Sequence, residues 1–237
     1  MTRRRAGHVR LEGGLAKMRF RDRSVAGQLL AEMLKPYAGR RDVLVLALPR
    51  GGVPVAFEVA RALDAPLDVF LVRKLGLPGQ EELAMGAIAT GGVLVLNEGV
   101  VAASGVSREA VERVAALEQR ELERRERLYR GALPPAVVEG RTVILVDDGL
   151  ATGATMRAAV KALKRRRPAQ IVVAVPVAAR ETCEEFRRSG DALCVCAETP
   201  TPFDWVGRWY TDFSQTTDEE VSALLARAGQ WGARLVA

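Results

Sequence analysis

The chain has 237 residues, 49% of them hydrophobic, and a formal net charge of +6. That length and apolar content suffice for one domain with a full hydrophobic core. No run of about eighteen apolar residues occurs, which excludes a membrane span. The single histidine, His8, excludes histidine-based catalytic triads and histidine metal clusters.

Most of the basic character belongs to the N-terminal segment. Residues 1–17 contain five basic residues and one acidic residue, a net charge of +4, which leaves +2 for the remainder. This glycine-containing segment is predicted to be a disordered tail, and residues 18–237 are predicted to form the single domain. A tail of this kind is a weak argument for nucleic-acid binding, so nucleic acid is not expected as a partner.

Helical and strand-like patterns alternate along the domain. An α/β fold with one Rossmann-like parallel sheet flanked by helices is therefore predicted. Helices are expected at about 24–34, 53–63, 107–130, 154–165, 180–188 and 218–227, and strands at about 43–48, 67–72, 83–88, 93–96, 143–146, 170–175 and 192–196. The charged helix at 107–130 is interpreted as a solvated crossover face.

The first strand runs into the loop Pro49-Arg50-Gly51-Gly52. Paired glycines permit a concave set of backbone N–H donors, and the planar guanidinium of Arg50 can bind two oxygens of a pyrophosphate. A purely structural turn is the alternative, because such a sequence alone is weak support for a ligand site.

The strand at 67–72 leads to Arg73 and Lys74, at the start of a Gly/Pro-rich segment that continues to Glu82 and is predicted to be an irregular loop. The two cations could bind an anion, or they could form a solvated strand end. No Lys, Arg or His occurs between Leu75 and Thr90, so the tip of this loop carries no cation.

The most informative segment is Val143 to Thr155, in which a buried strand is followed by Asp147, Asp148 and a Thr-Gly loop. Backbone N–H groups that open the next helix lack partners, and the helix dipole favours an anion there. Ionised carboxylates would repel a phosphate and instead accept hydrogen bonds from sugar hydroxyls or bind hydrated Mg²⁺. The segment therefore predicts a sugar-phosphate site.

This segment, with four apolar residues, an acidic pair and a Thr-Gly loop, resembles the signature of the type I phosphoribosyltransferases. The resemblance extends from about residue 18 to residue 229. It is chiefly a resemblance to bacterial members without an assigned acceptor. It implies their fold, with a small hood, and binding of 5-phosphoribosyl-1-pyrophosphate (PRPP) together with Mg²⁺. The implied PRPP-binding residues are Arg50, Gly51, Gly52, Arg73, Lys74, Asp147, Asp148, Gly149, Ala151, Thr152, Gly153, Ala154 and Thr155.

Within that set, the resemblance assigns the ribose hydroxyls to Asp147 and Asp148 and the 5′-phosphate to the Thr-Gly loop. Arg50 and Lys74 would contact pyrophosphate, so these four residues form the predicted catalytic group. Asp148 is the predicted metal ligand, through water. The implied reaction transfers the phosphoribosyl group to a nitrogen nucleophile, such as a nucleobase, and releases pyrophosphate.

The acceptor is less defined by the sequence. Purine members of the family commonly have an Asp at the position of Ala151, so no general base is expected from this loop. Aromatic residues at 203–210 loosely resemble a base-stacking segment, and Phe203 and Trp205 are the candidate acceptor contacts, with a packed hydrophobic cluster as the alternative. A second hypothesis is a non-catalytic protein that binds PRPP or a nucleotide and regulates transcription or RNA.

Three cysteines, Cys183, Cys194 and Cys196, contain no Cys-x-x-Cys pair. Reduced, buried thiols are expected here in preference to disulfides or zinc ligands, which favours a cytoplasmic location. A small-molecule enzyme with no membrane partner is predicted. A homodimer is left open, because family members are often dimers.

Overall fold

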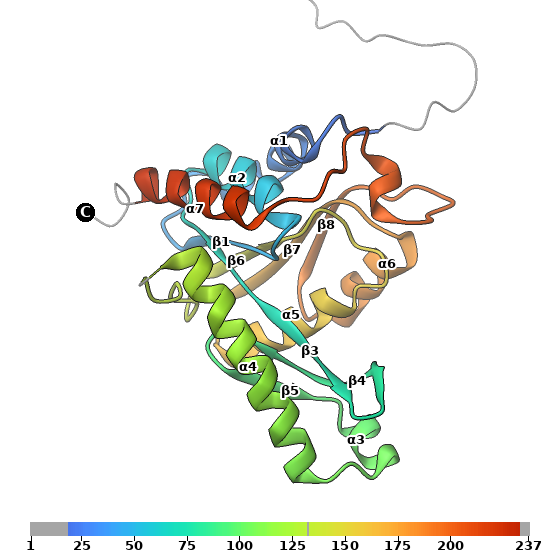
Figure 1. The fold of residues 1–237 in the computed structure, drawn as a ribbon. Helices are drawn as coiled ribbons and strands as arrows, with labels where there is room; N and C mark the ends of the chain where they lie inside the picture. The colour runs from blue at the N-terminus through green and yellow to red at the C-terminus, as the bar shows by residue number, and fades with distance from the viewer. Residues whose placement is uncertain (1–18, 132, 233–237) are drawn as a thin grey trace, which may run out of the picture.

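The computed structural model describes residues 19–131 and 133–232 (Figure 1). Its centre is a parallel sheet of five strands in the order β2-β1-β6-β7-β8. These strands are β1 (Val43–Ala47), β2 (Leu67–Val69), β6 (Thr142–Val146), β7 (Gln170–Val177) and β8 (Leu193–Glu198). The predicted fold class, a parallel sheet flanked by helices, is confirmed.

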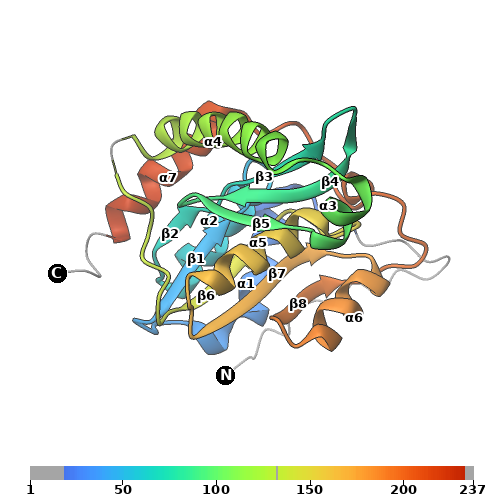
Figure 2. The same cartoon turned by 90° about the horizontal axis from the view of Figure 1, so that it is seen from below.

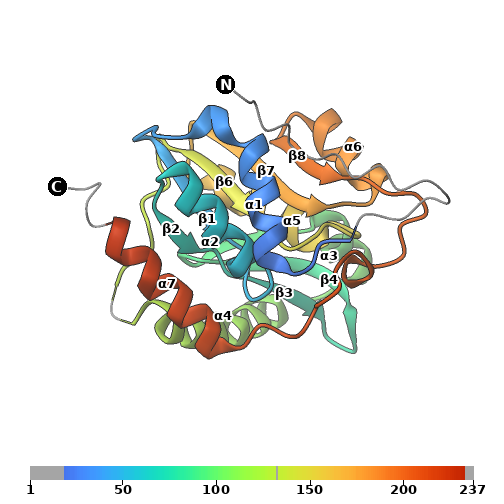
Figure 3. The same cartoon turned by 90° about the horizontal axis from the view of Figure 1, so that it is seen from above.

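Helices cover both faces of this sheet. On one face lie α1 (Arg23–Met33), α2 (Gly52–Leu63) and α7 (Asp218–Gly232), and on the other lie α5 (Ala154–Arg165) and α6 (Arg180–Ser189) (Figures 2 and 3). Successive residues of a strand point to opposite faces. Val43 and Val45 accordingly join the core beneath α1 and α2, whereas Leu44 and Leu46 join the core beneath α5.

A second sheet is antiparallel and lies against α5. It contains β3 (Val72–Leu77), β4 (Gln80–Ala89) and β5 (Val93–Leu96). Helix α5 contacts all three of these strands, and the long helix α4 (Arg108–Arg130) contacts β3, β4 and α7 (Figure 2). The second sheet and α4 thus form a layer outside α5.

The apolar run at 67–72 was predicted to be one strand, but it is divided between the two sheets. Strand β2 ends at Val69, where Phe70 still donates to the Ala47 carbonyl over 2.8 Å, and β3 begins at Val72 in the antiparallel sheet. Burial is continuous across the break, so hydrophobicity alone does not reveal the change of sheet.

The prediction of an irregular loop from Arg73 to Glu82 is wrong, because these residues form the hairpin of β3 and β4. The strands pair with a shifted register at Gly76, and Gly79 in the turn has a φ of 80°. A Cβ on Gly76 would lie 2.6 Å from the Glu81 carbonyl oxygen, so the strands approach closely where there is no side chain. Glycines that usually indicate a loop here permit a bulged hairpin.

The remaining predicted elements agree with the structure to within a few residues, and α5 has the predicted limits. A short helix, α3 (Glu98–Ser104), was not predicted. It begins after Asn97, whose side chain accepts from the Val100 N–H, and with seven residues it is too short for a clear helical periodicity in the sequence. Two 3₁₀ helices, η1 (Lys35–Tyr37) and η2 (Val206–Trp209), complete the elements in the described residues.

The small hood remains a prediction; the name hood is used below for residues 199–217, which meet the start of the described chain. Phe20 forms a parallel bridge with Tyr210, and its N–H donates to the Trp209 carbonyl over 2.8 Å. These three aromatic side chains are buried together with Ala26 and Val177. The tail predicted for residues 1–17 lies outside the described residues, and none of the described helices is both long and apolar enough to cross a membrane.

Candidate functional site

Two loops meet at the carboxyl edge of the central sheet, one after β1 and one after β6. A Cβ on Gly51 would overlap the Asp148 carboxylate, and one on Gly52 would lie 2.7 Å from the Val146 carbonyl oxygen. Glycine is therefore required at both positions by the close approach of the two loops. This edge is where open α/β sheets bind their ligands.

The acidic pair is held by groups from distant parts of the chain. Arg23, the first residue of α1, donates from Nε to Asp148 Oδ2 over 2.9 Å, and its Nη2 also lies 2.9 Å from that oxygen. The Tyr210 hydroxyl donates to the Asp148 carbonyl oxygen over 2.6 Å. Asp147 Oδ1 accepts from the Asp148 N–H over 2.9 Å. Both carboxylates thus have fixed orientations.

Arg23 also ties the acidic pair to the hood. Its Nη1 donates to the Ser214 carbonyl over 2.7 Å, and its guanidinium carbon lies 4.0 Å from the centre of the Phe213 ring. A guanidinium on an aromatic face is stabilised by the ring quadrupole. The arginine is therefore anchored on three sides and is poorly able to leave Asp148.

Burial controls the electrostatics of the pair. It raises the pKa of Asp147 well above its ordinary value, and the neighbouring Asp148 charge adds to the increase. Burial also raises the pKa of Asp148, but the Arg23 charge opposes this shift. Arg23 favours the ionised state of both aspartates, and with both ionised the three side chains carry a net charge of −1.

The predicted phosphate loop has the geometry of an anion site. Gly153 precedes α5 with a φ of 74°, and a Cβ there would lie 2.7 Å from Thr182 Cγ2. The Thr182 hydroxyl donates to the Ala151 carbonyl over 2.7 Å, which fixes the loop from the outside. No side chain caps α5, so its first N–H groups and the exposed Thr152 and Thr155 are available to a ligand.

Each predicted pyrophosphate cation has a carboxylate near it. Arg50 Nη1 lies 3.7 Å from Asp218 of α7, Arg73 Nη2 lies 2.6 Å from Glu118 of α4, and Lys74 Nζ lies 3.1 Å from Glu82 of β4. Arg73 and Lys74 are consecutive in β3 and so point to opposite faces. Ligand anions would have to compete with these acidic partners.

Two arginines near the site were not predicted from the sequence. Arg23 contacts the acidic pair from 125 residues away, and no local pattern marks it. Arg125 of α4 lines a small cleft together with Pro49, Arg73 and Thr155. Arg125 pairs with Glu121 over 2.8 Å, four residues earlier in the same helix. This i to i+4 spacing is visible in the sequence, but there the helix is interpreted as a solvated crossover face.

The aromatic segment is divided between packing and exposure. Trp209 and Tyr210 are each 3% exposed, in agreement with the packed-cluster alternative, and Phe203 is half-buried beside them. Trp205 is 57% exposed and meets Phe213 edge-on, with ring centres 6.1 Å apart. The next residue, Val206, occupies the space that a Cβ on Gly149 would need, so the hood adjoins the acidic loop.

The acidic pair also fits a hard cation. Asp148 Oδ2 is bound to Arg23, which leaves Oδ1 for a water-mediated contact, and among the described residues no Lys or Arg forms an ion pair with Asp147. Mg²⁺ is held in proteins by one or two carboxylates, several waters and substrate phosphates. Asp147 and Asp148 can supply the protein oxygens of such a site.

An α/β sheet with glycine loops and an acidic pair at its carboxyl edge is typical of the type I phosphoribosyltransferases. The family model of the phosphoribosyl transferase domain matches residues 23–208, so the chain belongs to the phosphoribosyltransferase family, as predicted.

Similar proteins agree with this assignment. The chain is 46% identical over 209 residues to proteins of two Mycobacterium tuberculosis strains that are provisionally named phosphoribosyl transferases. That match covers 88% of this chain and 47% of theirs, so the chain spans about half the length of these curated relatives. The crystal structure of TT1426 from Thermus thermophilus is 47% identical, with a TM-score of 0.78, over 89% of this chain and 99% of that one.

Proposed function

We propose that this chain transfers the 5-phosphoribosyl group of PRPP to a nitrogen nucleophile, with Mg²⁺, and releases pyrophosphate. The observation that carries the proposal is the contact of Gly51 and Gly52 with Asp148 and Asp147. It brings a basic glycine loop within reach of the acidic pair, as a phosphorylated ribose with a pyrophosphate at C1 requires.

In this proposal, each loop binds one part of PRPP. Asp147 and Asp148 accept hydrogen bonds from the ribose hydroxyls, and the N–H groups of residues 151–155, with the α5 dipole, bind the 5′-phosphate. Gly51 and Gly52 present N–H donors to the pyrophosphate, and Arg50, Arg73 and Lys74 supply positive charge. Arg125, which shares a cleft with Arg73, extends this positive surface.

The rate enhancement would come from electrostatics. When pyrophosphate leaves C1, the ribosyl centre becomes positive, and a carboxylate about 5 to 6 Å away at an effective dielectric of about 20 contributes roughly 3 kcal/mol. Both carboxylates can contribute this charge, because Arg23 favours the ionised state of Asp147 as well as that of Asp148. Bound Mg²⁺ supplies neutralisation of the departing pyrophosphate.

Exposed Trp205 is proposed to stack on a flat acceptor ring, with half-buried Phe203 beside it. With Ala151 in the phosphate loop, that loop offers no side-chain base to the acceptor. A nucleobase or amine that attacks without such help therefore suits the site best. The homodimer and the cytoplasmic location remain predictions.

The decisive experiment incubates the protein with PRPP, Mg²⁺ and individual nucleobases and measures pyrophosphate release. We expect release with one base and none from the double variant Asp147→Asn/Asp148→Asn. The control Asp191→Asn removes an exposed carboxylate that pairs with Lys164, and it should retain activity. Undiminished, PRPP-dependent release in the double variant would contradict the proposal.

A regulatory protein that binds PRPP without turnover is the second candidate. The pairing of Arg50, Arg73 and Lys74 with acidic residues favours it, as does the absence of cations at the hairpin tip. Calorimetry with PRPP and Mg²⁺ separates the two candidates. Tight binding with no pyrophosphate release from any base would identify the regulatory protein.

A further inference from the structure

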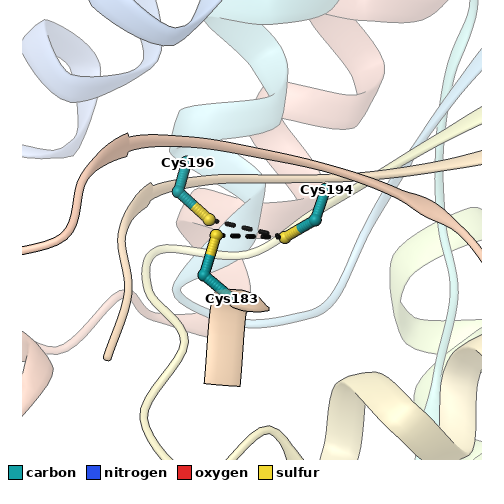
Figure 4. A group of neighbouring side chains, drawn as sticks. All are labelled: Cys183, Cys194 and Cys196. Carbon is teal, nitrogen blue, oxygen red and sulfur yellow. Dashed lines mark hydrogen bonds between the residues drawn. The ribbon is translucent and has the colours of Figure 1, made fainter. Parts of the chain in front are cut away.

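The three cysteines of the chain converge on one point between α6 and β8 (Figure 4). The sulfur of Cys194 lies 3.5 Å from that of Cys183 and 3.4 Å from that of Cys196, and all three lie within 4.8 Å of one another. All three are free thiols. The sequence did not indicate the cluster, because Cys183 joins it from a separate element.

Strand geometry explains how two of the sulfurs come together. Cys194 and Cys196 are two residues apart in β8, so their side chains lie on the same face, towards α6 and Cys183. Val195, between them, packs against the opposite core, beneath α1 and α2. Cys183 and Cys196 are buried, and Cys194 is half-buried.

We propose that Cys183, Cys194 and Cys196 form a three-thiolate binding site for Cu(I). Thiolate sulfur selects soft metals such as Cu(I) and Zn(II). The described residues provide three ligand atoms at this point and no fourth from His, Cys, Asp or Glu. Structural zinc is almost always four-coordinate, whereas three sulfurs complete a trigonal Cu(I) site.

The spacing of the sulfurs is close to what a metal needs. For a metal–sulfur distance of about 2.3 Å, a regular trigonal site has sulfurs about 4.0 Å apart. The two short sulfur–sulfur distances are 3.5 and 3.4 Å, so each would increase by roughly half an ångström, and the third pair lies within 4.8 Å. Small rotations of the cysteine side chains can provide this without movement of α6 or β8.

An open cleft of about 840 Å³ reaches Cys194, the half-buried member of the cluster. Cys194 lines this cleft together with Lys164, Arg187 and Asp191. Arg187 also donates to the Cys194 carbonyl oxygen over 3.4 Å, so a positive charge lies beside the sulfurs. A metal could enter through this cleft, and Arg187 would offset the negative charge of the thiolates.

The third sulfur separates this proposal from two simpler explanations. A disulfide joins two cysteines and would leave the third without a role, and it would need an oxidant. Buried cysteines can also act as small apolar side chains, but that role does not require all three sulfurs to converge. The cluster is distinct from the phosphate loop, although Thr182, next to Cys183, donates to the Ala151 carbonyl of that loop.

The test uses the full-length, reduced protein under anaerobic conditions, titrated with Cu(I) against a chromophoric Cu(I) chelator. We expect one Cu(I) per chain, an X-ray absorption spectrum with three sulfur neighbours, and loss of all three alkylatable thiols on binding. Because the chain has three cysteines, every thiol counted belongs to the cluster. No step depends on PRPP, so the result is independent of the proposed transferase activity.

Each of Cys183→Ser, Cys194→Ser and Cys196→Ser should weaken Cu(I) binding by at least about a hundredfold, since even outer-shell changes cost about ten- to a hundredfold. Val195→Ala is the matched control, because its side chain points away from the cluster, and it should bind as the unaltered protein does. Any of three results would overturn the proposal: fewer than three sulfur neighbours around the metal, unchanged Cu(I) affinity in Cys196→Ser, or tighter retention of Zn(II) than of Cu(I).

Discussion

Asp147 is a residue whose ionisation opposes folding. Its carboxyl group is buried, and burial raises its pKa above the value in the unfolded chain. The folded state therefore holds this proton more tightly than the unfolded state does, and stability falls as the pH rises from the unfolded pKa through the folded pKa. The charge proposed to bind ribose is thus kept at a cost in stability.

The variant Asp147→Asn should consequently be more stable than the unaltered protein at pH 8, although PRPP binding is lost. The amide oxygen can still accept from the Asp148 N–H, so the loop is preserved. Urea unfolding at several pH values measures the effect. The stability difference should shrink towards zero as the pH approaches about 3.9, the ordinary pKa of Asp. A difference that grows in acid would contradict this interpretation.

Arg23, in contrast to the ionised Asp147, favours folding, because its positive charge stabilises the ionised acidic pair. The side chains of Arg23 and Asp148 are 11% and 16% exposed, so Arg23→Gln leaves a nearly buried carboxylate without its cation. We expect a loss of about 3 kcal/mol in the free energy of unfolding and a shift of PRPP binding to higher pH. Thermal unfolding and calorimetry across pH provide the measurements.

Arg21→Gln is the matched control for Arg23→Gln. Arg21 pairs with Asp22, but its side chain is 75% exposed, so the loss should stay below about 1 kcal/mol. A double-mutant cycle with Asp148→Asn isolates the pairing energy of Arg23 and Asp148. Equal losses for Arg21→Gln and Arg23→Gln would show that Arg23 does not support the acidic pair.

At the scale of elements, helix α7 contacts the proposed pyrophosphate loop through its first residue. Asp218 lies 3.7 Å from Arg50 and accepts from the Tyr129 hydroxyl of α4 over 2.6 Å. Burial, which has the larger effect, and this hydrogen bond together raise the pKa of Tyr129 to about 12. One carboxylate therefore joins α7, α4 and the loop after β1.

The variant Asp218→Asn should bind pyrophosphate more tightly, because it keeps an acceptor for Tyr129 and removes the charge that competes for Arg50. A half-exposed ion pair contributes about 0.2 to 1 kcal/mol, which corresponds to about a 1.4- to 5-fold gain in affinity. Isothermal titration with pyrophosphate and Mg²⁺ measures it. The control Glu219→Gln changes an exposed residue in the same turn and should not alter pyrophosphate binding. Weaker binding by Asp218→Asn would refute the idea that Asp218 competes with pyrophosphate for Arg50.

The βα units around β1 and β6 could be predicted from the sequence because each is local: a buried strand, a glycine loop and a helix follow one another. The hairpin of β3 and β4 could not, since Gly76 and Gly79 are as typical of a loop as of a bulged turn. Arg23 and Arg125 were also beyond prediction. Their roles depend on which helices pack beside the loops, and that is a property of the tertiary structure.

At the scale of the whole molecule, the loops proposed to bind the ligand belong to two sheets. The phosphate loop and acidic pair follow β6 of the central sheet, whereas Arg73 and Lys74 belong to β3 of the antiparallel sheet. Helix α5 lies between the sheets and contacts both (Figure 2). A ligand that reaches from the phosphate loop to β3 would therefore connect the two layers.

Hydrogen exchange should detect this connection. PRPP with Mg²⁺ should protect the amides of residues 151–155 and those of the 72–82 hairpin. Ribose 5-phosphate should protect 151–155 alone, because it lacks the pyrophosphate that β3 is proposed to bind. Mass spectrometry of peptic fragments measures the two regions separately. Equal protection of the hairpin by both ligands would exclude a pyrophosphate contact from β3.

The contacts of Tyr210 with Asp148 and of Phe213 with Arg23 have a consequence for biosynthesis. On the ribosome, Asp148 is made some sixty residues before Tyr210 and Phe213, the aromatic groups that fix its carbonyl and its arginine partner. A nascent polypeptide can form the central strands early, but the proposed ribose site stays unfinished until translation has passed residue 214. Fragments that stop before the hood should therefore fold in part and remain unable to hold a ribose.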